Sequence, residues 1–330
     1  MRRLFICLVY TACISILSIL VWVILIPVSL PFSPYTLTVN AHKTMSQVAG
    51  ALQQTGIIRS REVMVILARL AGTDRMLKAG RYRFSGSVSM LEILQQFAAG
   101  MPNEDSITVI EGWTFKQFRT LLAQNPNIQH LTLGWTNAQI LQKIGATEDH
   151  AEGLFFPDTY YFAPGSTDLD LYSRAYRSMQ HTLTTVWQHR HADLPLPSPY
   201  QLLILASLIE KETGNNTDRG LVSAVFINRL QQGIRLQTDP SVIYGMGERY
   251  TGNITKADLE RDTPYNTYTR VGLPPTPITL PSRAALEAAA HPASSTALYF
   301  VGRGDGRSDF SNTLQQHNSA VRKYILKTQE

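Results

Sequence analysis

Cysteine is nearly absent from this chain. Its 330 residues include two cysteines, Cys7 and Cys13, and both lie in the first apolar run. The remaining chain therefore has no thiol, which excludes a disulfide framework, thiol catalysis and a cysteine zinc site there. Charge is sparse as well, since 17% of the residues are charged and the net charge is +5. This mild positive balance suits an anionic polymer or a membrane surface and does not single out nucleic acid.

Several catalytic signatures are missing too. The 8 histidines have no metal-binding spacing and no HExxH sequence occurs, so we expect neither a metal nor a cofactor. A GxSxG motif and a phosphate loop are absent. An arginine-rich run, a zinc finger and an RNP motif are also absent, so we expect no nucleic-acid partner. Carboxylates with amides and hydroxyls around them remain, and these are the groups that glycan cleavage uses.

The N-terminus predicts a membrane anchor. Leu4 to Ile26 is an uncharged apolar run, longer than the ~20 residues that cross a bilayer as a helix. Arg2 and Arg3 precede it, and positive residues stay on the cytoplasmic side. We therefore expect a cytoplasmic tail at 1–3, a single transmembrane helix at 4–26 in the inner membrane, and the catalytic part outside. A cleaved signal peptide is the alternative; the run is long for a signal core, and no small-x-small cleavage site follows.

Residues 27–36 are rich in proline and predict a stiff linker. The next segment predicts a small α/β module with strands at Leu37–Val39 and Gly80–Phe84. Its helices are predicted from a Thr44–Gln47 capping box to Gln54, from Arg61 to Ala71, and from Ser89 to Phe97. A similar strand, turn and capping box recur at 107–122. This is either an internal repeat or the ordinary appearance of such a unit. Tyr82 and Phe84 could stack on a sugar, but core positions are the simpler interpretation.

The most informative stretch runs from Ser198 to Met246. Ser198 followed by Pro199 predicts the start of a helix, and Gly214 predicts its end in a left-handed conformation. Between them, Leu202 to Ile209 is apolar on nearly every side, so we expect this helix to be buried.

Glu210 ends that buried helix and shares a side with Leu203, Ala206 and Ser207. A carboxylic acid at this position is partly desolvated, which favours its neutral form and makes it a candidate proton donor. The alternative is that Glu210, Lys211 and Glu212 form one solvated helix end.

Short elements follow this helix. A second helix is predicted from Thr217 or Asp218 to Gln231, ended by Gly233. A strand-like segment, Ile234–Thr238, and a short helix opened by Asp239 come next. These turns bring a polar set close together in sequence: Glu210, Asn228, Arg229, Gln237 and Asp239.

Two further segments are candidates for a binding groove. Ala151 to Thr167 is dense in aromatic residues, which could form either a sugar-binding wall or a packed core. The run Val271 to Ile278 holds three prolines in four residues, so it is neither a helix nor a central strand. We expect a rigid loop there, which would hold binding residues or form a structural corner.

The sequences LASLIEKET, SAVFINRL and RLQTDPSVIYGMG, in this order, resemble the signature of the endolytic murein transglycosylases, the MltG/YceG-like family. The EG-FP-TY pattern at 152–160, YNTY at 265–268 and GLPPTPI at 272–278 match it as well. Ser308 stands where the family usually has a histidine, which argues that such a histidine is not essential to the chemistry.

The resemblance implies a mixed α+β fold, with a LysM-like subdomain at 37–105 and a transglycosylase domain at 106–330. It places the catalytic role on the first acidic residue of the helix-end motif, Glu210. A substrate-binding set is expected with it: Glu152, Tyr160, Asn228, Gln237, Asp239, Tyr265 and Asn266.

The expected reaction is cleavage within nascent peptidoglycan strands. Glu210 would protonate the glycosidic oxygen, and the C6 hydroxyl of N-acetylmuramic acid would then close a 1,6-anhydro ring. The family also implies wall synthases, such as penicillin-binding proteins, as partners. Two alternatives stay open: a glycan hydrolase that uses Glu210 and Asp239 as its two carboxylates, and a non-catalytic wall-binding scaffold.

Overall fold

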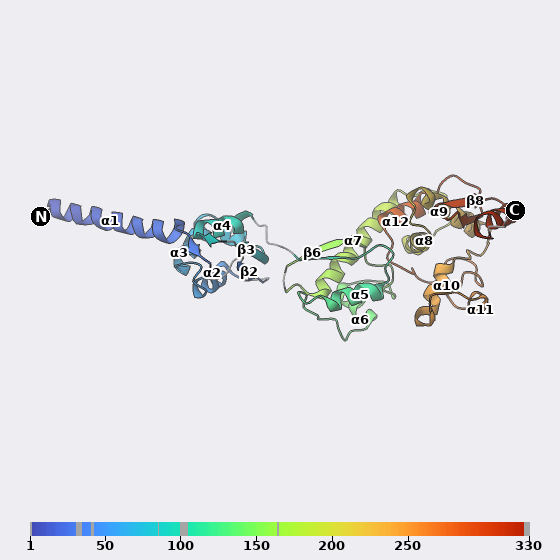
Figure 1. Ribbon diagram of the computed structural model, residues 1–330, viewed down its shortest axis with the longest axis horizontal. Coiled ribbons are helices and arrows are strands. Elements are labelled where there is room, and N and C mark those ends of the chain that lie inside the picture. Colours follow the sequence, from blue (N-terminus) through green and yellow to red (C-terminus); the bar gives the residue numbers. More distant parts are fainter. Residues whose placement is uncertain are drawn as a thin grey trace. The chain divides into compact units, whose positions relative to one another are not determined.

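A computed structural model of the chain describes residues 2–30, 35–40, 43–84, 86–99, 105–163 and 165–326 (Figure 1). Helices and two-stranded sheets alternate along it, which confirms the mixed α+β class. The contacts divide the chain into two compact units. One is Met1–Ile107 with Pro126–Gln129 and Tyr161–Thr167, and the other is Thr108–Asn125, His130–Tyr160 and Asp168–Glu330. None of the helices among the described residues has the length and apolarity that a membrane crossing needs.

The N-terminal elements are α1 (Arg2–Leu25), β1 (Val28–Ser29), β2 (Tyr35–Val39), α2 (Met45–Gln54), α3 (Arg61–Leu70), η1 (Thr73–Arg75), β3 (Gly80–Phe84), β4 (Ser87–Val88) and α4 (Met90–Ala99). β2 and β3 are antiparallel, and Leu37 lies opposite Tyr82. Tyr82 and Phe84 are 1% and 2% exposed, so both are core residues. Neither ring is available as a stacking surface for a sugar.

The later elements are β5 (Asp105–Thr108), α5 (Phe115–Gln124), α6 (Asn137–Ile144), β6 (Thr159–Phe162), α7 (Asp168–Gln188), α8 (Pro199–Glu212), α9 (Asn216–Gln231), α10 (Asp239–Met246), η2 (Gly247–Arg249), α11 (Lys256–Glu260), α12 (Arg283–Ala290), β7 (Tyr299–Gly302), β8 (Ser308–Ser311), α13 (Leu314–Val321) and the π-helical turn η3 (Arg322–Leu326). β7 and β8 form an antiparallel pair.

Helix α8 is the centre of the second unit. Every residue from 202 to 209 is buried, and the helix packs on α7, α9, α10 and α12. The predicted start is confirmed, because the Ser198 hydroxyl accepts the Gln201 N–H and Pro199 follows. The predicted left-handed Gly214 is wrong. Thr213 adopts an extended conformation after Glu212 and ends the helix before the glycine is reached.

Capping boxes open α2 at Thr44–Gln47 and α5 at Thr114–Gln117, as predicted. The same box opens α6, α11 and α13. It is therefore a general way of starting helices in this chain and does not mark a repeat.

The predicted strand at Ile234–Thr238 is wrong, because this segment has no sheet partner. The guanidinium of Arg229 donates to the carbonyl oxygens of Arg235 and Leu236, at 3.1 and 2.8 Å. Gln237 adopts a positive φ of 51°, which is incompatible with a regular strand. A side chain from α9 thus takes the bonds that a neighbouring strand would have made.

Candidate active site

Three consecutive residues at the end of α8 lie on three different sides of the helix. One residue advances an α-helix by about 100°, so Glu210, Lys211 and Glu212 meet different surroundings. Glu210 bonds to the residue before α12, Lys211 lines a cleft, and Glu212 bonds to the residue before α10. The alternative of a single solvated helix end is therefore wrong for both glutamates.

Glu210 accepts two hydrogen bonds from Ser282, the N-cap of α12. The backbone N–H of Ser282 lies 2.9 Å and its hydroxyl 2.5 Å from the same carboxylate oxygen. One turn earlier on this side of α8, the Ser207 hydroxyl accepts the Ile278 N–H at 3.0 Å. We call the run 271–278 the proline loop. Ser207 thus holds the end of this loop, and Glu210 holds the start of α12.

Glu212 has different neighbours. It is partly buried and accepts a short hydrogen bond from the Thr238 hydroxyl. Burial raises the pKa of Glu212 to about 7; Thr238 opposes this shift, the negative charge of Asp239 adds to it, and Arg229 opposes it. A carboxyl with this pKa is available as both acid and base near neutral pH. The prediction from sequence passed over this residue, although it belongs to the same motif.

Arg229 is 7% exposed and organises the residues around Glu212. Its guanidinium donates to Gln237 Oε1 at 3.3 Å, as well as to the 235 and 236 carbonyls. Gln237 is the non-glycine residue with positive φ in the described chain. Such strain persists where the surroundings enforce it and often marks a functional position. Gln237 is exposed and precedes Thr238, the residue whose hydroxyl bonds to Glu212.

Asp239 opens α10 and accepts the Tyr268 hydroxyl at 2.5 Å. Tyr268 comes from the loop between α11 and the prolines. Burial raises the pKa of Tyr268, and the charges of Asp239 and Glu212 add to this shift. Asp239, Glu212 and Tyr268 therefore form one electrostatic group. We call Glu212, Arg229, Gln237, Asp239 and Tyr268 the acid cluster.

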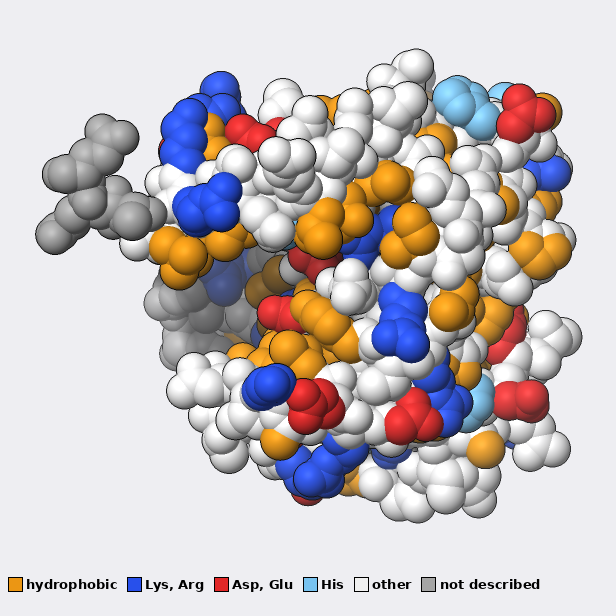
Figure 2. All heavy atoms as spheres, turned by 90° about the vertical axis from the view of Figure 1, so that its right-hand side faces the viewer, with side chains coloured by type: hydrophobic (Ala, Val, Ile, Leu, Met, Phe, Trp, Pro, Cys, Tyr) orange, Lys and Arg blue, Asp and Glu red, His pale blue; other side chains and the backbone are white. Residues whose placement is uncertain are grey.

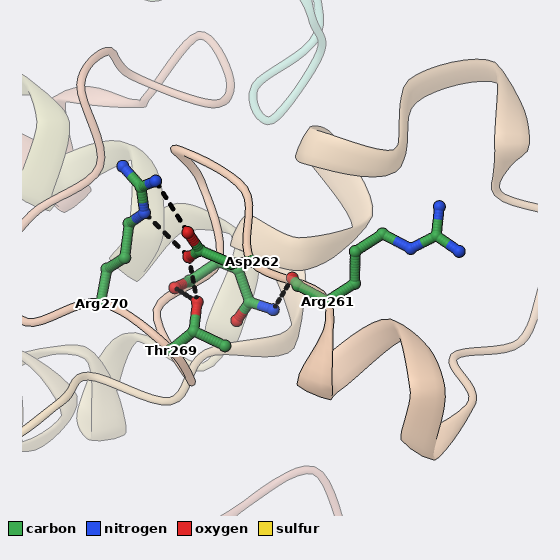
Figure 3. Close-up of polar contacts among 5 residues, drawn as sticks. Arg261, Asp262, Thr269 and Arg270 are labelled. Atoms are coloured by element: carbon green, nitrogen blue, oxygen red, sulfur yellow. Dashed lines mark hydrogen bonds and ion pairs between the residues drawn. The ribbon is translucent and has the colours of Figure 1, made fainter.

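The loop that carries Tyr268 is closed by an ion pair. Nε and Nη2 of Arg270 donate to the two oxygens of the Asp262 carboxylate, each at 2.9 Å, and the Thr269 hydroxyl donates to it at 2.8 Å (Figure 3). Arg270 holds the pKa of Asp262 down at about 2, so the pair persists at any physiological pH. Within this loop Asn266 is 1% exposed. Its amide nitrogen donates to three backbone carbonyls and its oxygen accepts the Tyr268 N–H.

A cleft of about 1000 Å³ lies beside the acid cluster. Its lining comes mainly from the start of α5, the segment 150–152, α10 and the loop residues Tyr265 and Thr276: Gly112, Thr114, Phe115, Lys116, Gln117, Arg119, Asn137, His150, Ala151, Glu152, Lys211, Pro240, Ile243, Tyr244, Gly247, Glu248, Tyr250, Tyr265, Thr276 and Ile278. Lys211 belongs to it, whereas Glu210 and Glu212 do not. Gly112 joins the cleft to Glu210, because a Cβ there would lie 3.8 Å from Glu210 Cγ.

Glu152 is the buried carboxyl of this cleft, 8% exposed. One oxygen accepts the Phe115 N–H at 2.8 Å, and the other accepts the Tyr244 hydroxyl at 3.2 Å. Burial raises the pKa of Glu152 to about 7, against the effect of these donors. Tyr244 meets Tyr265 edge to face at 4.9 Å, and the Tyr265 hydroxyl lies 2.9 Å from the hydroxyl oxygen of Thr276.

Gly153 fixes the position of Glu152. It has a φ of 81°, and a Cβ there would lie 2.4 Å from Pro277 Cβ. Both constraints require glycine. The EG pair therefore packs backbone directly on the proline loop, which brings Thr276 and Ile278 into the cleft wall.

Two predicted substrate residues lie elsewhere. Tyr160 is 4% exposed, and its hydroxyl donates to the Phe156 carbonyl at 2.5 Å. The amide nitrogen of Asn228 donates to the carbonyls of Ser295 and Ala297, both at 2.9 Å. Tyr160 therefore packs in the core, and Asn228 ties α9 to the chain before β7.

The aromatic-rich segment contributes to the core as well. Phe155 is 0% exposed and stacks on Phe115 at 4.7 Å, with Phe118 and Tyr172 at its edges. This cluster supports the start of α5, and so the N–H that Glu152 accepts. Packing thus explains Phe155, Tyr160 and Phe162 of this segment, whereas Tyr161 is 57% exposed.

Comparison with known proteins supports the motif resemblance. The model of the YceG-like family matches residues 37–323. A Bacillus subtilis (strain 168) protein named endolytic murein transglycosylase is 29% identical over 324 residues, which span 90% of this chain and 87% of that protein. A Streptococcus pneumoniae (serotype 2, strain D39) protein of the same name is 27% identical, over 91% of this chain and 60% of its own length.

A crystal structure of a YceG-like protein from Listeria monocytogenes has a similar fold. Its TM-score is 0.54 at 27% sequence identity, and the match covers 86% of this chain and 98% of that one.

Proposed function

Because the chain belongs to the YceG-like family, we propose that it is an endolytic murein transglycosylase. The relatives named above bear that name. The single observation that carries the proposal is the acid cluster, where a carboxyl with a pKa of about 7 lies among groups that can bind a sugar.

Glu212 suits the role of proton donor better than Glu210. Its partial burial and the Asp239 charge keep a fraction of it protonated at neutral pH. Glu210 is the residue that the motif resemblance favours, and it stays the alternative. Its carboxylate accepts two hydrogen bonds from Ser282 at the N-terminus of α12, and Gly112 of the cleft wall lies next to it.

In the proposed reaction the Glu212 carboxyl gives its proton to the glycosidic oxygen that leaves N-acetylmuramic acid. The C1–O bond breaks, and positive charge develops on the ring. The carboxylate of Asp239 stabilises that charge. The C6 hydroxyl of the same sugar then bonds to C1, and Glu212 takes up its proton. The acid is regenerated, no water is consumed, and the new end is a 1,6-anhydro sugar.

Gln237 would bind the acetamido or hydroxyl groups, because its side chain is exposed and Arg229 of the acid cluster holds its amide oxygen. Tyr265 lines the cleft, and Asn266 acts through the loop by holding Tyr268. Glu152 contributes to the cleft wall.

A two-carboxylate hydrolase is the second candidate, since Asp239 is close enough to Glu212 to raise its pKa. The mass of the products decides between the two. Purified wall digested by the full chain is expected to release fragments with 1,6-anhydro ends. Fragments heavier by one water, with reducing ends, would establish the hydrolase. Binding to the wall without any released fragment would leave only the scaffold.

We also propose that the chain is anchored in the inner membrane with its N-terminus in the cytoplasm. The uncharged run from Leu4 to Ile26 and the exposed apolar side chains of α1, such as Ile14 and Leu17, support this. Wall synthases, including penicillin-binding proteins, would then be neighbours of the enzyme at the site of wall synthesis. The segment 37–105 would act as a LysM-like subdomain that binds the glycan. A fluorescent protein fused before residue 1 is expected to be protected from external protease in spheroplasts.

A further inference from the structure

Neither Glu210 nor Glu212 lines the cleft of about 1000 Å³. Lys211 lies between those two glutamates and lines the cleft. A substrate that reaches the acid cluster therefore has the cleft next to it, on the adjacent side of the same helix end. The cleft is placed for a part of the substrate other than the bond that breaks.

Three cationic side chains line the cleft: Lys116, Arg119 and Lys211. Lys211 makes no hydrogen bond or ion pair within the described part of the chain. The Arg119 guanidinium donates to Asn137 Oδ1 at 2.8 Å and to the Trp135 carbonyl at 2.9 Å, so it bonds to neutral acceptors and not to a carboxylate. Both cations keep an uncompensated charge.

The acidic groups of the lining do not cancel this charge. Glu248 pairs with Lys116 at 2.7 Å, and both side chains are exposed. Glu152 is buried behind the Phe115 N–H and the Tyr244 hydroxyl. With Lys116 paired, Lys211 and Arg119 are the cations of the lining that no carboxylate pairs with in the described part of the chain.

Apolar and aromatic side chains form another part of the wall. Pro240, Ile243, Tyr244, Tyr265 and Ile278 belong to it. On the face shown in Figure 2, basic, acidic and hydrophobic side chains are intermixed. Among the described residues, the cleft combines an unpaired Lys211 with the apolar residues of its wall.

We propose that this cleft binds the peptide stem of the murein strand, with Lys211 pairing with a stem carboxylate. The proposal rests on the proposed function, because it supplies the substrate. A stem combines aliphatic side chains with free carboxylates and branches from the sugar whose bond is cleaved. Arg119 supplies a second positive charge in the cleft, and the apolar wall packs on the aliphatic side chains. The site thus selects strands that still carry their stems.

Binding of a soluble stem tetrapeptide to the full chain tests the site without any catalysis. The peptide with a free C-terminal carboxylate is expected to bind about tenfold more tightly than its C-terminal amide, since a charge-assisted hydrogen bond is lost in the amide. Lys211→Ala is expected to remove this difference, and Lys211→Arg to retain most of it. Lys256→Ala, on exposed α11, is the matched control and should bind like the parent chain. Equal binding of acid and amide, or an unaltered Lys211→Ala, overturns the proposal.

Turnover separates this inference from the proposed function. The rate of 1,6-anhydro end formation, as kcat/KM, is compared on strands with stems and on strands stripped by an amidase. We expect stems to raise it about tenfold in the parent chain and much less in Lys211→Ala. If both substrates give anhydro ends at the same rate and the peptide does not bind, the stem site is refuted and the proposed function is not. Peptide binding without anhydro ends from either substrate refutes the proposed function instead.

Discussion

Glu210 and Glu212 are two residues apart and contact different segments of the chain. Glu210 faces the N-terminus of α12 and receives two donors from Ser282. Glu212 faces the start of α10, where Asp239 adds a negative charge. A helix that turns about 200° over two residues separates them. One motif thus supplies a carboxylate that holds a helix in place and a carboxyl that can exchange a proton.

The largest expected effect comes from Glu212→Gln. Removal of a general acid is expected to lower the rate of anhydro product formation about a thousandfold. Glu210→Gln keeps an oxygen that can accept from Ser282, so it should retain activity within about tenfold of the parent. Digestion of purified wall, followed by mass spectrometry, measures both. If Glu210→Gln is inactive and folded while Glu212→Gln is active, the roles are reversed and the motif resemblance identified the acid.

Glu152 is a third carboxyl to set beside Glu210 and Glu212. It is buried, accepts two hydrogen bonds and has a raised pKa. Its pKa rises from 4.5 in the unfolded chain to about 7 in the folded protein. The folded state therefore binds more protons between these values, and its stability falls as the pH rises through 7. This single group accounts for up to about 3 kcal/mol. Glu152→Gln should flatten the pH dependence of urea unfolding between pH 5 and 8 by that amount.

The matched control for Glu152 is Glu111→Gln, because Glu111 is exposed. It should leave the pH dependence as it is in the parent chain. A Glu152→Gln curve parallel to the parent curve would mean that the carboxyl stays ionised inside the fold.

Ser282→Ala examines the structural side of the comparison. It removes both the side chain that caps α12 and the hydroxyl that donates a hydrogen bond to Glu210. A lost N-cap costs about 1 kcal/mol, and urea unfolding should report about 1–2 kcal/mol with the second bond included. Combined with Glu210→Gln the losses should be less than additive, and combined with Glu212→Gln they should add. If the effect of Ser282→Ala on stability is non-additive with Glu212→Gln and additive with Glu210→Gln, Glu210 is not the carboxylate that holds α12.

The smallest expected effect is a shift of the pH profile. Asp239→Asn removes the negative charge that helps to raise the pKa of Glu212. The pKa of Glu212 should fall, so the alkaline limb of the rate profile should move to lower pH by less than about one unit. Initial rates from pH 5 to 9 measure it. If the alkaline limb moves to higher pH, or does not move, the general acid is not next to Asp239.

Local patterns were sufficient to predict much of the fold. The Ser198 cap, the buried run of α8 and the capping boxes of α2 and α5 depend on neighbours in sequence. Ile234–Thr238 was misassigned because its alternating pattern is that of a strand, whereas the guanidinium of Arg229 determines its conformation.

The site was harder to predict, since it depends on distant contacts. Within the motif, the order of the two acids favours Glu210; their different contacts come from Ser282 and Thr238, in other segments. Asn266 and Asn228 have side chains typical of sugar binding, yet backbone carbonyls occupy their amides. The one available signal for Glu212 was its position two residues after Glu210, which turns it toward the segment that contains Asp239.

Gly153 sets a limit on how this enzyme can be altered. Its bare α-carbon lies against the ring of Pro277, and the chain continues from that proline to the serine that holds α12. Gly153→Ala would force the two segments apart. It would therefore displace both the cleft wall and the Ser282 contact that holds α12. The spacing of both features is therefore governed by the smallest side chain in the protein, at a position that bears no chemistry of its own.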